Sequence, residues 1–79
     1  MPASPVVRYR IVGQSSGEWH LYRDEQLIDI EHDPERSPLE EIFLWATRVV
    51  WAEDRLTVVG WSDVTQTNAP ATYVARIDG

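Results

Sequence analysis

The chain has 79 residues, a formal net charge of −6 and no cysteine, and all seven of its basic residues are arginine. A chain of this length forms one small domain, which we expect to span residues 1–79 with residues 1–5 as a flexible N-terminus. The composition excludes a disulfide framework and thiolate metal sites, and no apolar run reaches membrane-spanning length. We therefore expect a cytoplasmic protein that does not bind membranes.

Within residues 6–12, Val7, Tyr9 and Ile11 alternate with Arg8 and Arg10, which is typical of a half-buried antiparallel strand. The turn-forming residues 13–17 follow, and residues 18–22 resume the alternation, so the two segments predict a hairpin. Residues 26–31 predict a third strand after a tight reversal at Asp24 and Glu25. In that strand we expect Ile28 and Ile30 to face the core, with Asp29 and Glu31 on the opposite face.

Residues 37–55 carry the one long helical signal in the sequence. Ser37, Pro38 and Glu40 have the spacing of a capping box with proline at the first helical position. The apolar residues that recur at helical spacing form one broad face for the core, namely Leu39, Ile42, Phe43, Ala46, Val49 and Val50. The helix should begin within one residue of Ser37.

Two further strands are predicted after the helix, at residues 56–61 and 72–77, separated by a polar loop. In the first of them, Leu56 and Val58 should face one way and Trp61 the other, with its side chain accessible. The order βββ-α-ββ predicts an α+β fold of two layers, with the helix packed across one face of an antiparallel sheet of about five strands.

Negative charge is concentrated in one part of the chain. Residues 24–41 contain eight acidic residues and one arginine, whereas the rest of the chain is nearly neutral. A concentrated negative field repels phosphate backbones and attracts basic surfaces, which argues against direct nucleic-acid binding. The bland interpretation is a solvated acidic edge that keeps a small protein soluble.

Two outward positions of the helix are also unusual. Leu44 and Trp51 lie seven residues apart and point away from the core face, so they form a second, narrower apolar stripe. Such a stripe is covered either by another part of the chain or by another chain. With Trp61, these side chains are candidate anchors for a partner, because tryptophan is favoured in binding hot spots.

Catalytic and metal-binding motifs are weak in this sequence. Residues 13–17 match G-x-S-x-G, but the motif works at a strand-to-helix turn and here lies between two strands, so Ser15 is not expected to be a nucleophile. The acidic run around His32 contains potential metal ligands, but no glycine stands where a calcium-binding loop needs one. We expect no catalytic residues, no bound metal and no cofactor.

The sequence therefore favours a non-enzymatic interaction protein, an inhibitor or adaptor. Its partner would be a basic surface of another protein, including a surface that binds nucleic acid. Its size and acidity, though no motif, resemble those of small phage-encoded inhibitors such as anti-CRISPR and anti-restriction proteins. The alternative is a structural homodimer that uses the Leu44 and Trp51 stripe as its interface. The residues expected to bind the partner are Asp29, Glu31, Asp33, Glu35, Glu40, Glu41, Leu44, Trp51 and Trp61.

Overall fold

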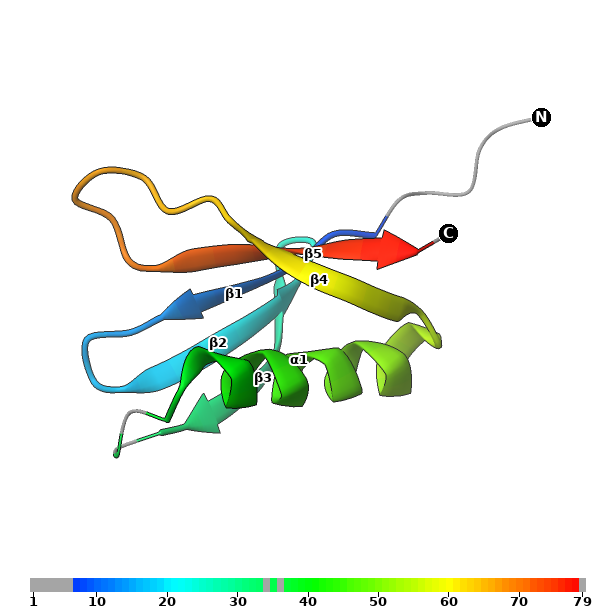
Figure 1. Ribbon diagram of the computed structural model, residues 1–79, viewed down its shortest axis with the longest axis horizontal. Helices are drawn as coiled ribbons and strands as arrows, with labels where there is room; N and C mark the ends of the chain where they lie inside the picture. Colours follow the sequence, from blue (N-terminus) through cyan, green and yellow to red (C-terminus); the bar gives the residue numbers. More distant parts are fainter. Residues whose placement is uncertain (1–6, 34, 36, 79) are drawn as a thin grey trace.

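The computed structural model describes residues 7–33, 35 and 37–78, so the expected flexible N-terminus at residues 1–5 lies outside the described residues. Its elements are β1 (Tyr9–Gly13), β2 (Glu18–Arg23), β3 (Gln26–His32), α1 (Leu39–Asp54), β4 (Thr57–Asp63) and β5 (Thr72–Asp78). The strands form one antiparallel sheet in the order β3-β2-β1-β5-β4, and α1 lies across one face of it (Figure 1). The two-layer α+β fold predicted from the sequence is confirmed.

The two tight connections in the first half of the sheet follow from their residue types. Gly17 has a φ of 93°, and its N–H donates to the carbonyl of Gln14 at 3.0 Å. Asp24 has a φ of 54°, a left-handed conformation that aspartate tolerates better than most residues. The Asp24 carboxylate also accepts a hydrogen bond from the N–H of Arg8 at 3.0 Å, which fixes the β2–β3 turn against the start of β1.

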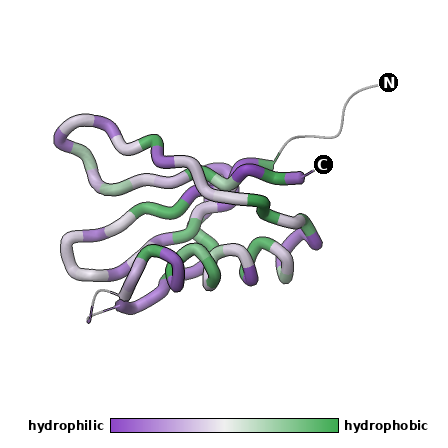
Figure 2. Tube along the Cα trace, in the orientation of Figure 1, coloured by the Kyte–Doolittle hydropathy of each residue, from purple (hydrophilic) through white to green (hydrophobic). Residues whose placement is uncertain are grey.

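The core lies between the sheet and the inner face of α1. Its fully or almost fully buried side chains come from β1, β2 and α1, and they are Tyr9, Ile11, Leu21, Ile42, Ala46 and Val50. Figure 2 shows hydrophobic and hydrophilic residues alternating along α1, as a helix with one buried face requires. Leu39, which the helical spacing placed on that face, is 40% exposed because it begins the first turn of the helix.

A β-bulge changes the phase of β3. Leu21 pairs with Asp29 but Tyr22 pairs with Leu27, so Ile28 is an extra residue in the strand. As a result Asp29 and Glu31 lie on the helix side, while Ile30 pairs with His20 on the open face and is 46% exposed. The prediction that Ile28 and Ile30 share the core face was therefore wrong, since only Ile28 packs against the core.

A second bulge has the same effect in β4. Val58 pairs with Ile77 and Gly60 with Arg76, which leaves Val59 without a partner across the ladder and 59% exposed. The extra residue returns Trp61 to the same face as Val58. Its ring stacks on Phe43 at a centroid distance of 6.1 Å, and its indole N–H donates to the hydroxyl of Thr47 at 3.1 Å. The expectation of an accessible Trp61 facing away from Val58 is corrected by this geometry.

The start of α1 also differs from the prediction. The helix begins at Leu39, and Pro38 occupies the cap position without a side-chain hydrogen bond to the first turn. Ser37 does not cap the helix, because its N–H and hydroxyl donate instead to the carboxylate of Asp33, at 2.7 and 2.8 Å. This pair fixes the segment that joins β3 to the helix.

The end of α1 is held by a polar network that reaches into the core. Asp54 accepts hydrogen bonds from Arg23, at 2.8 Å from Nε, and from the hydroxyl of Tyr9. The hydrogen bonds from Arg23 and then Tyr9 hold the pKa of the Asp54 carboxyl below its usual value. Burial and the hydrogen bond to Asp54 raise the pKa of Tyr9 to about 12. Arg55 then ends the helix in a left-handed conformation, with its N–H donating to Trp51.

Candidate interaction surface

The acidic residues predicted to bind a partner divide into two groups in the structure. Asp29 and Asp33 act within the chain: Asp29 accepts a hydrogen bond from the indole N–H of Trp45 at 3.2 Å, and Asp33 is buried and bonded to Ser37. Because buried or bonded carboxylates are costly to detach, these two residues have structural roles. Asp33, which the sequence placed among the partner contacts, is 7% exposed and is already bonded within the chain.

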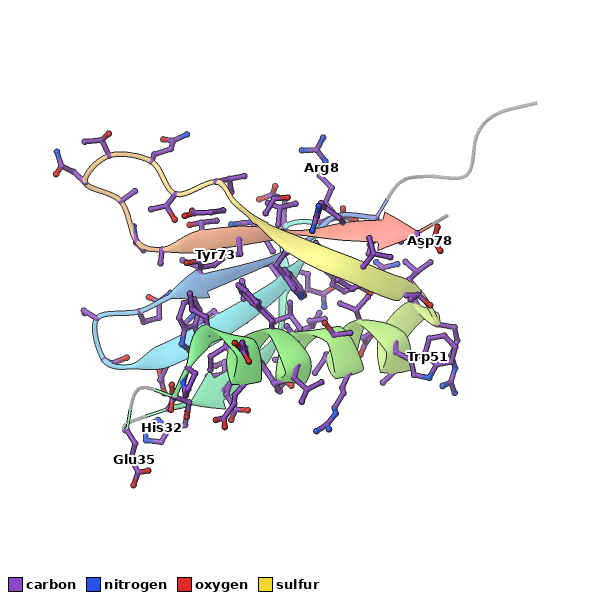
Figure 3. The ribbon with its side chains drawn as sticks, viewed as in Figure 1. Arg8, His32, Glu35, Trp51, Tyr73 and Asp78 are labelled. Atoms are coloured by element: carbon purple, nitrogen blue, oxygen red, sulfur yellow. The ribbon has the colours of Figure 1, made fainter. Side chains whose placement is uncertain are left out.

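The remaining acidic residues gather where β3 ends and α1 begins. Glu35, Glu40 and Glu41 are exposed, and Glu31 is half-buried on the helix side of β3. Glu31 and Glu41 come from different elements, yet both line one open cavity of about 200 Å³. We call these four residues, Glu31, Glu35, Glu40 and Glu41, the acidic surface. Figure 3 shows Glu35 beside His32 at this end of the molecule.

Exposed apolar side chains adjoin the acidic surface on α1. Leu39 precedes Glu40 directly, and Leu44 follows Glu40 by one helical turn and is 50% exposed. The sequence pattern predicted the outward position of Leu44 but placed Leu39 on the core face of the helix. Two exposed leucines on the first turns of α1 thus adjoin exposed glutamates of the acidic surface.

Trp51 is exposed on the outward side of α1, but it is not close to the acidic surface. Its side chain is 49% exposed, and the guanidinium carbon of Arg55 lies 5.6 Å from its ring centroid. Eleven residues separate it from Glu40, which is about 16 Å along a helix. Figure 3 shows Trp51 at the opposite end of α1 from Glu35. A partner must therefore follow most of the helix to contact both.

The open face of the sheet carries an arginine, aromatic rings and apolar side chains. Arg10 lies over the ring of Tyr22, at 4.4 Å from its centroid, and approaches Glu25 at 3.9 Å. Asp29 and Glu31, expected on this face, lie on the helix side because of the bulge in β3, and Ile30 lies here instead, on the same face as Leu27. The face is thus more apolar at its β3 edge than the sequence alternation indicates.

Two histidines share one carboxylate on the same face. Nε2 of His20 lies 3.7 Å from Glu18, and Nδ1 of His32 lies 3.6 Å from it. Within residues 7–33, 35 and 37–78, no group of three or more such side chains is arranged to hold a metal ion.

Ser15 lies in the loop of the β1–β2 hairpin and not at a strand-to-helix turn. The geometry of a nucleophile elbow is therefore missing at the one G-x-S-x-G match.

Comparison of the chain with protein-family models, with curated proteins and with solved structures found no match. The helix of the described region is too short and too polar to cross a bilayer.

Proposed function

We propose that this chain is a non-enzymatic interaction protein, an inhibitor or adaptor, that binds a basic surface of another protein. The observation that carries the proposal is the acidic surface, in which Glu31, Glu35, Glu40 and Glu41 surround the beginning of α1 next to two exposed leucines. Charge supplies long-range attraction and selects a basic partner, while Leu39 and Leu44 supply contacts that lose water on binding.

The electrostatic field supports a protein partner over a nucleic acid. The net charge of −6 arises mainly from residues 24–41, and three of the four glutamates of the acidic surface, Glu35, Glu40 and Glu41, are exposed in that segment. A phosphate backbone would be repelled, whereas a groove that normally binds phosphates would attract this surface. The protein can thus compete with nucleic acid for a basic partner without binding nucleic acid itself. The absence of cysteine supports a reducing, cytoplasmic setting for this binding.

The proposal is tested by affinity capture from a lysate of the host cell with the full chain and two variants, run in parallel at low and high salt. Glu40→Arg combined with Glu41→Arg reverses charge in the acidic surface. Glu53→Arg is the matched control, because Glu53 is an exposed glutamate of the same helix outside that surface. A specific partner should be stoichiometric with the wild type and the control, absent with the double variant, and weakened by salt.

Two results would overturn the proposal. One is the lack of any stoichiometric partner at low salt. The other is a partner that the double variant retains as well as the wild type does, because binding would then not depend on the acidic surface.

Homodimerisation through the outer face of α1 is the alternative function, and the exposure of Trp51 at 49% favours it. Sedimentation velocity over a wide concentration range separates the two proposals. A dimer that dissociates in the Trp51→Glu variant supports the alternative, and a monomer at every concentration excludes it.

A further inference from the structure

Two cavities lie at the end of the molecule where the β1–β2 loop approaches the segment before α1. The first has a volume of about 250 Å³ and is lined by Gly13, Gln14, Ser15, Gly17, Trp19, Asp33 and Ser37. The second, of about 460 Å³, shares Trp19 and the beginning of the loop with the first and extends to Pro70 and Ala71. The indole of Trp19 is therefore a wall common to both.

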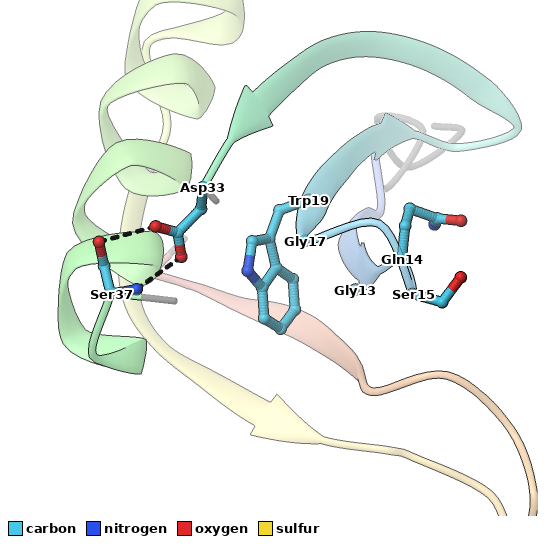
Figure 4. Close-up of a pocket in the computed structure, with 7 residues that line it drawn as sticks. All are labelled: Gly13, Gln14, Ser15, Gly17, Trp19, Asp33 and Ser37. Atoms are coloured by element: carbon cyan, nitrogen blue, oxygen red, sulfur yellow. Dashed lines mark hydrogen bonds between the residues drawn. The ribbon is translucent and has the colours of Figure 1, made fainter. Parts of the chain in front are cut away.

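The position of Trp19 is fixed by the strand pairing. Trp19 pairs with Gly13 across β1 and β2, and a Cβ atom at Gly13 would lie 3.1 Å from the indole ring. Glycine thus lets the indole ring approach the backbone of β1 closely. Figure 4 shows the nitrogen edge of the indole turned toward Asp33 and Ser37, on the far wall of the first cavity.

The far wall carries a buried negative charge. Asp33 is only 7% exposed, and its carboxylate accepts two hydrogen bonds from Ser37. A carboxylate has room for about four such bonds, so it can accept more from a ligand. Asp33 and Ser37 also line the third cavity, next to Glu31 and Glu41 of the acidic surface. The three cavities therefore form a series along one end of the fold.

The ionised side chains among the described residues that line this series are carboxylates. The described residues that line the three cavities include three carboxylates and one histidine, and no arginine. An aromatic ring and a buried carboxylate that line one cavity are groups that bind a cationic side chain, through a cation–π contact with the ring and charge-assisted hydrogen bonds to the carboxylate. A neutral ligand would leave this negative field uncompensated.

We propose that the cavity between Trp19 and Asp33 binds an arginine side chain of a partner protein. The guanidinium stacks on the indole of Trp19 and donates hydrogen bonds to Asp33. The partner's backbone on either side of that arginine extends toward Glu31. Arginine fits better than lysine because its planar group stacks on a ring and donates in several directions at once. That the arginine belongs to a partner protein rests on the proposed function. Binding of an arginine side chain in the cavity can be tested without that partner.

The test uses nuclear magnetic resonance of the full chain titrated with two blocked tripeptides, acetyl-Gly-Arg-Gly-amide and the same peptide with citrulline. Citrulline has nearly the shape of arginine but no charge. The arginine peptide should shift the Trp19 indole and Gly17 amide signals saturably, with a dissociation constant in the millimolar range. It should bind on the order of tenfold more tightly than the citrulline peptide, and binding should weaken with salt.

Three variants locate the binding. Trp19→Leu removes the aromatic wall and should weaken binding about tenfold. Glu31→Gln removes one surface charge at the edge of the series and should weaken it less. Tyr22→Leu is the matched control, because it removes an aromatic ring from the same strand but from the opposite face, and it should bind as the wild type does. The amide spectrum of each variant reports whether it is folded.

The inference is overturned if the two peptides bind equally, if neither gives a saturable shift at tens of millimolar, or if the shifts appear on α1 and not at Trp19. Shifts confined to α1 would leave the proposed function standing while removing this cavity from it. Conversely, saturable binding at Trp19 together with a capture experiment that finds no partner would remove the proposed function and keep the cavity as an arginine site.

Discussion

The two ends of α1 are built for different purposes. At its last turn, Asp54 is tied to Arg23 and to the buried hydroxyl of Tyr9, so the helix is joined to β1 and β2 by charge-assisted hydrogen bonds. At its first turn there is no side-chain cap, and Glu40 and Glu41 are exposed. The comparison teaches that side-chain hydrogen bonds join the end of the helix to the sheet, whereas its first turn carries exposed carboxylates without a side-chain cap.

The largest effect is expected from Tyr9→Phe, which removes only the hydroxyl at the stabilised end. Loss of a hydrogen bond from a buried group to a charged acceptor should lower the free energy of unfolding by about 1.5–3 kcal/mol. Urea denaturation followed by tryptophan fluorescence measures this. Tyr73→Phe is the control, since no hydrogen bond of the Tyr73 hydroxyl is found among the described residues, and it should change stability by less than about 0.5 kcal/mol.

The same network predicts how stability depends on pH. The pKa of Asp54 is lower in the folded chain, so its contribution is complete above the unfolded pKa of about 4 and is lost as pH falls through the folded pKa. The pKa of Tyr9 is raised to about 12 in the folded chain, so its contribution is complete below the unfolded pKa of about 10 and is lost as pH rises toward 12.

Unfolding measured from pH 2 to pH 12 should therefore lose stability at both extremes. The Asp54→Asn variant should lose less than the wild type at the acid end, and Tyr9→Phe should lose less at the alkaline end. Parallel curves for wild type and variants would contradict the account. The pKa of Asp63 is also lowered, by its hydrogen bonds from Thr65, so Asp63→Asn serves as a second acid-side comparison.

A smaller effect is expected in the segment that leads into α1. Ser37→Ala removes the hydroxyl that donates to Asp33 but keeps the backbone hydrogen bond, and it should cost about 1 kcal/mol. Thermal unfolding of Ser37→Ala beside Ser62→Ala, a serine in β4 on the open face of the sheet, measures the difference. An equal loss in both would mean that the Asp33–Ser37 pair has no special role.

The smallest change in stability is expected at the acidic surface itself. Glu40→Gln with Glu41→Gln removes two charges that favour the positive end of the helix dipole, and it should lower stability by less than about 1 kcal/mol in total. A loss larger than that of Tyr9→Phe would show that these glutamates stabilise the fold, which would break the contrast between the two ends of α1.

The sequence predicted the element order, the two-layer fold and most of the buried face of α1, because these depend on local periodicity. It did not predict the bulges in β3 and β4, because the apolar pattern of the sequence does not show where an extra residue enters a strand. Every side chain after that residue points to the opposite face of the sheet. The error placed Ile30 on the core face in place of Asp29 and Glu31, and it placed Trp61 on the face away from Val58, whereas Trp61 packs against the core.

The candidate site was predicted in part for a similar reason. Charge density along the chain identified the acidic segment, but it could not separate Glu35, which is exposed, from Asp33, which bonds to Ser37. The serine four residues after Asp33 was the available signal, and the capping-box pattern assigned that serine to the helix. The cavity at Trp19 depends on a pairing with Gly13 that only the register of the hairpin reveals.

The central claim is that the acidic surface binds a basic partner by charge. The most direct test is the dissociation constant of the purified partner measured from low to high salt with wild type and with Glu40→Gln/Glu41→Gln. The account predicts that the wild type weakens steeply with salt, and that the variant binds more weakly at low salt with a shallower dependence. Identical salt dependence in both proteins would contradict it.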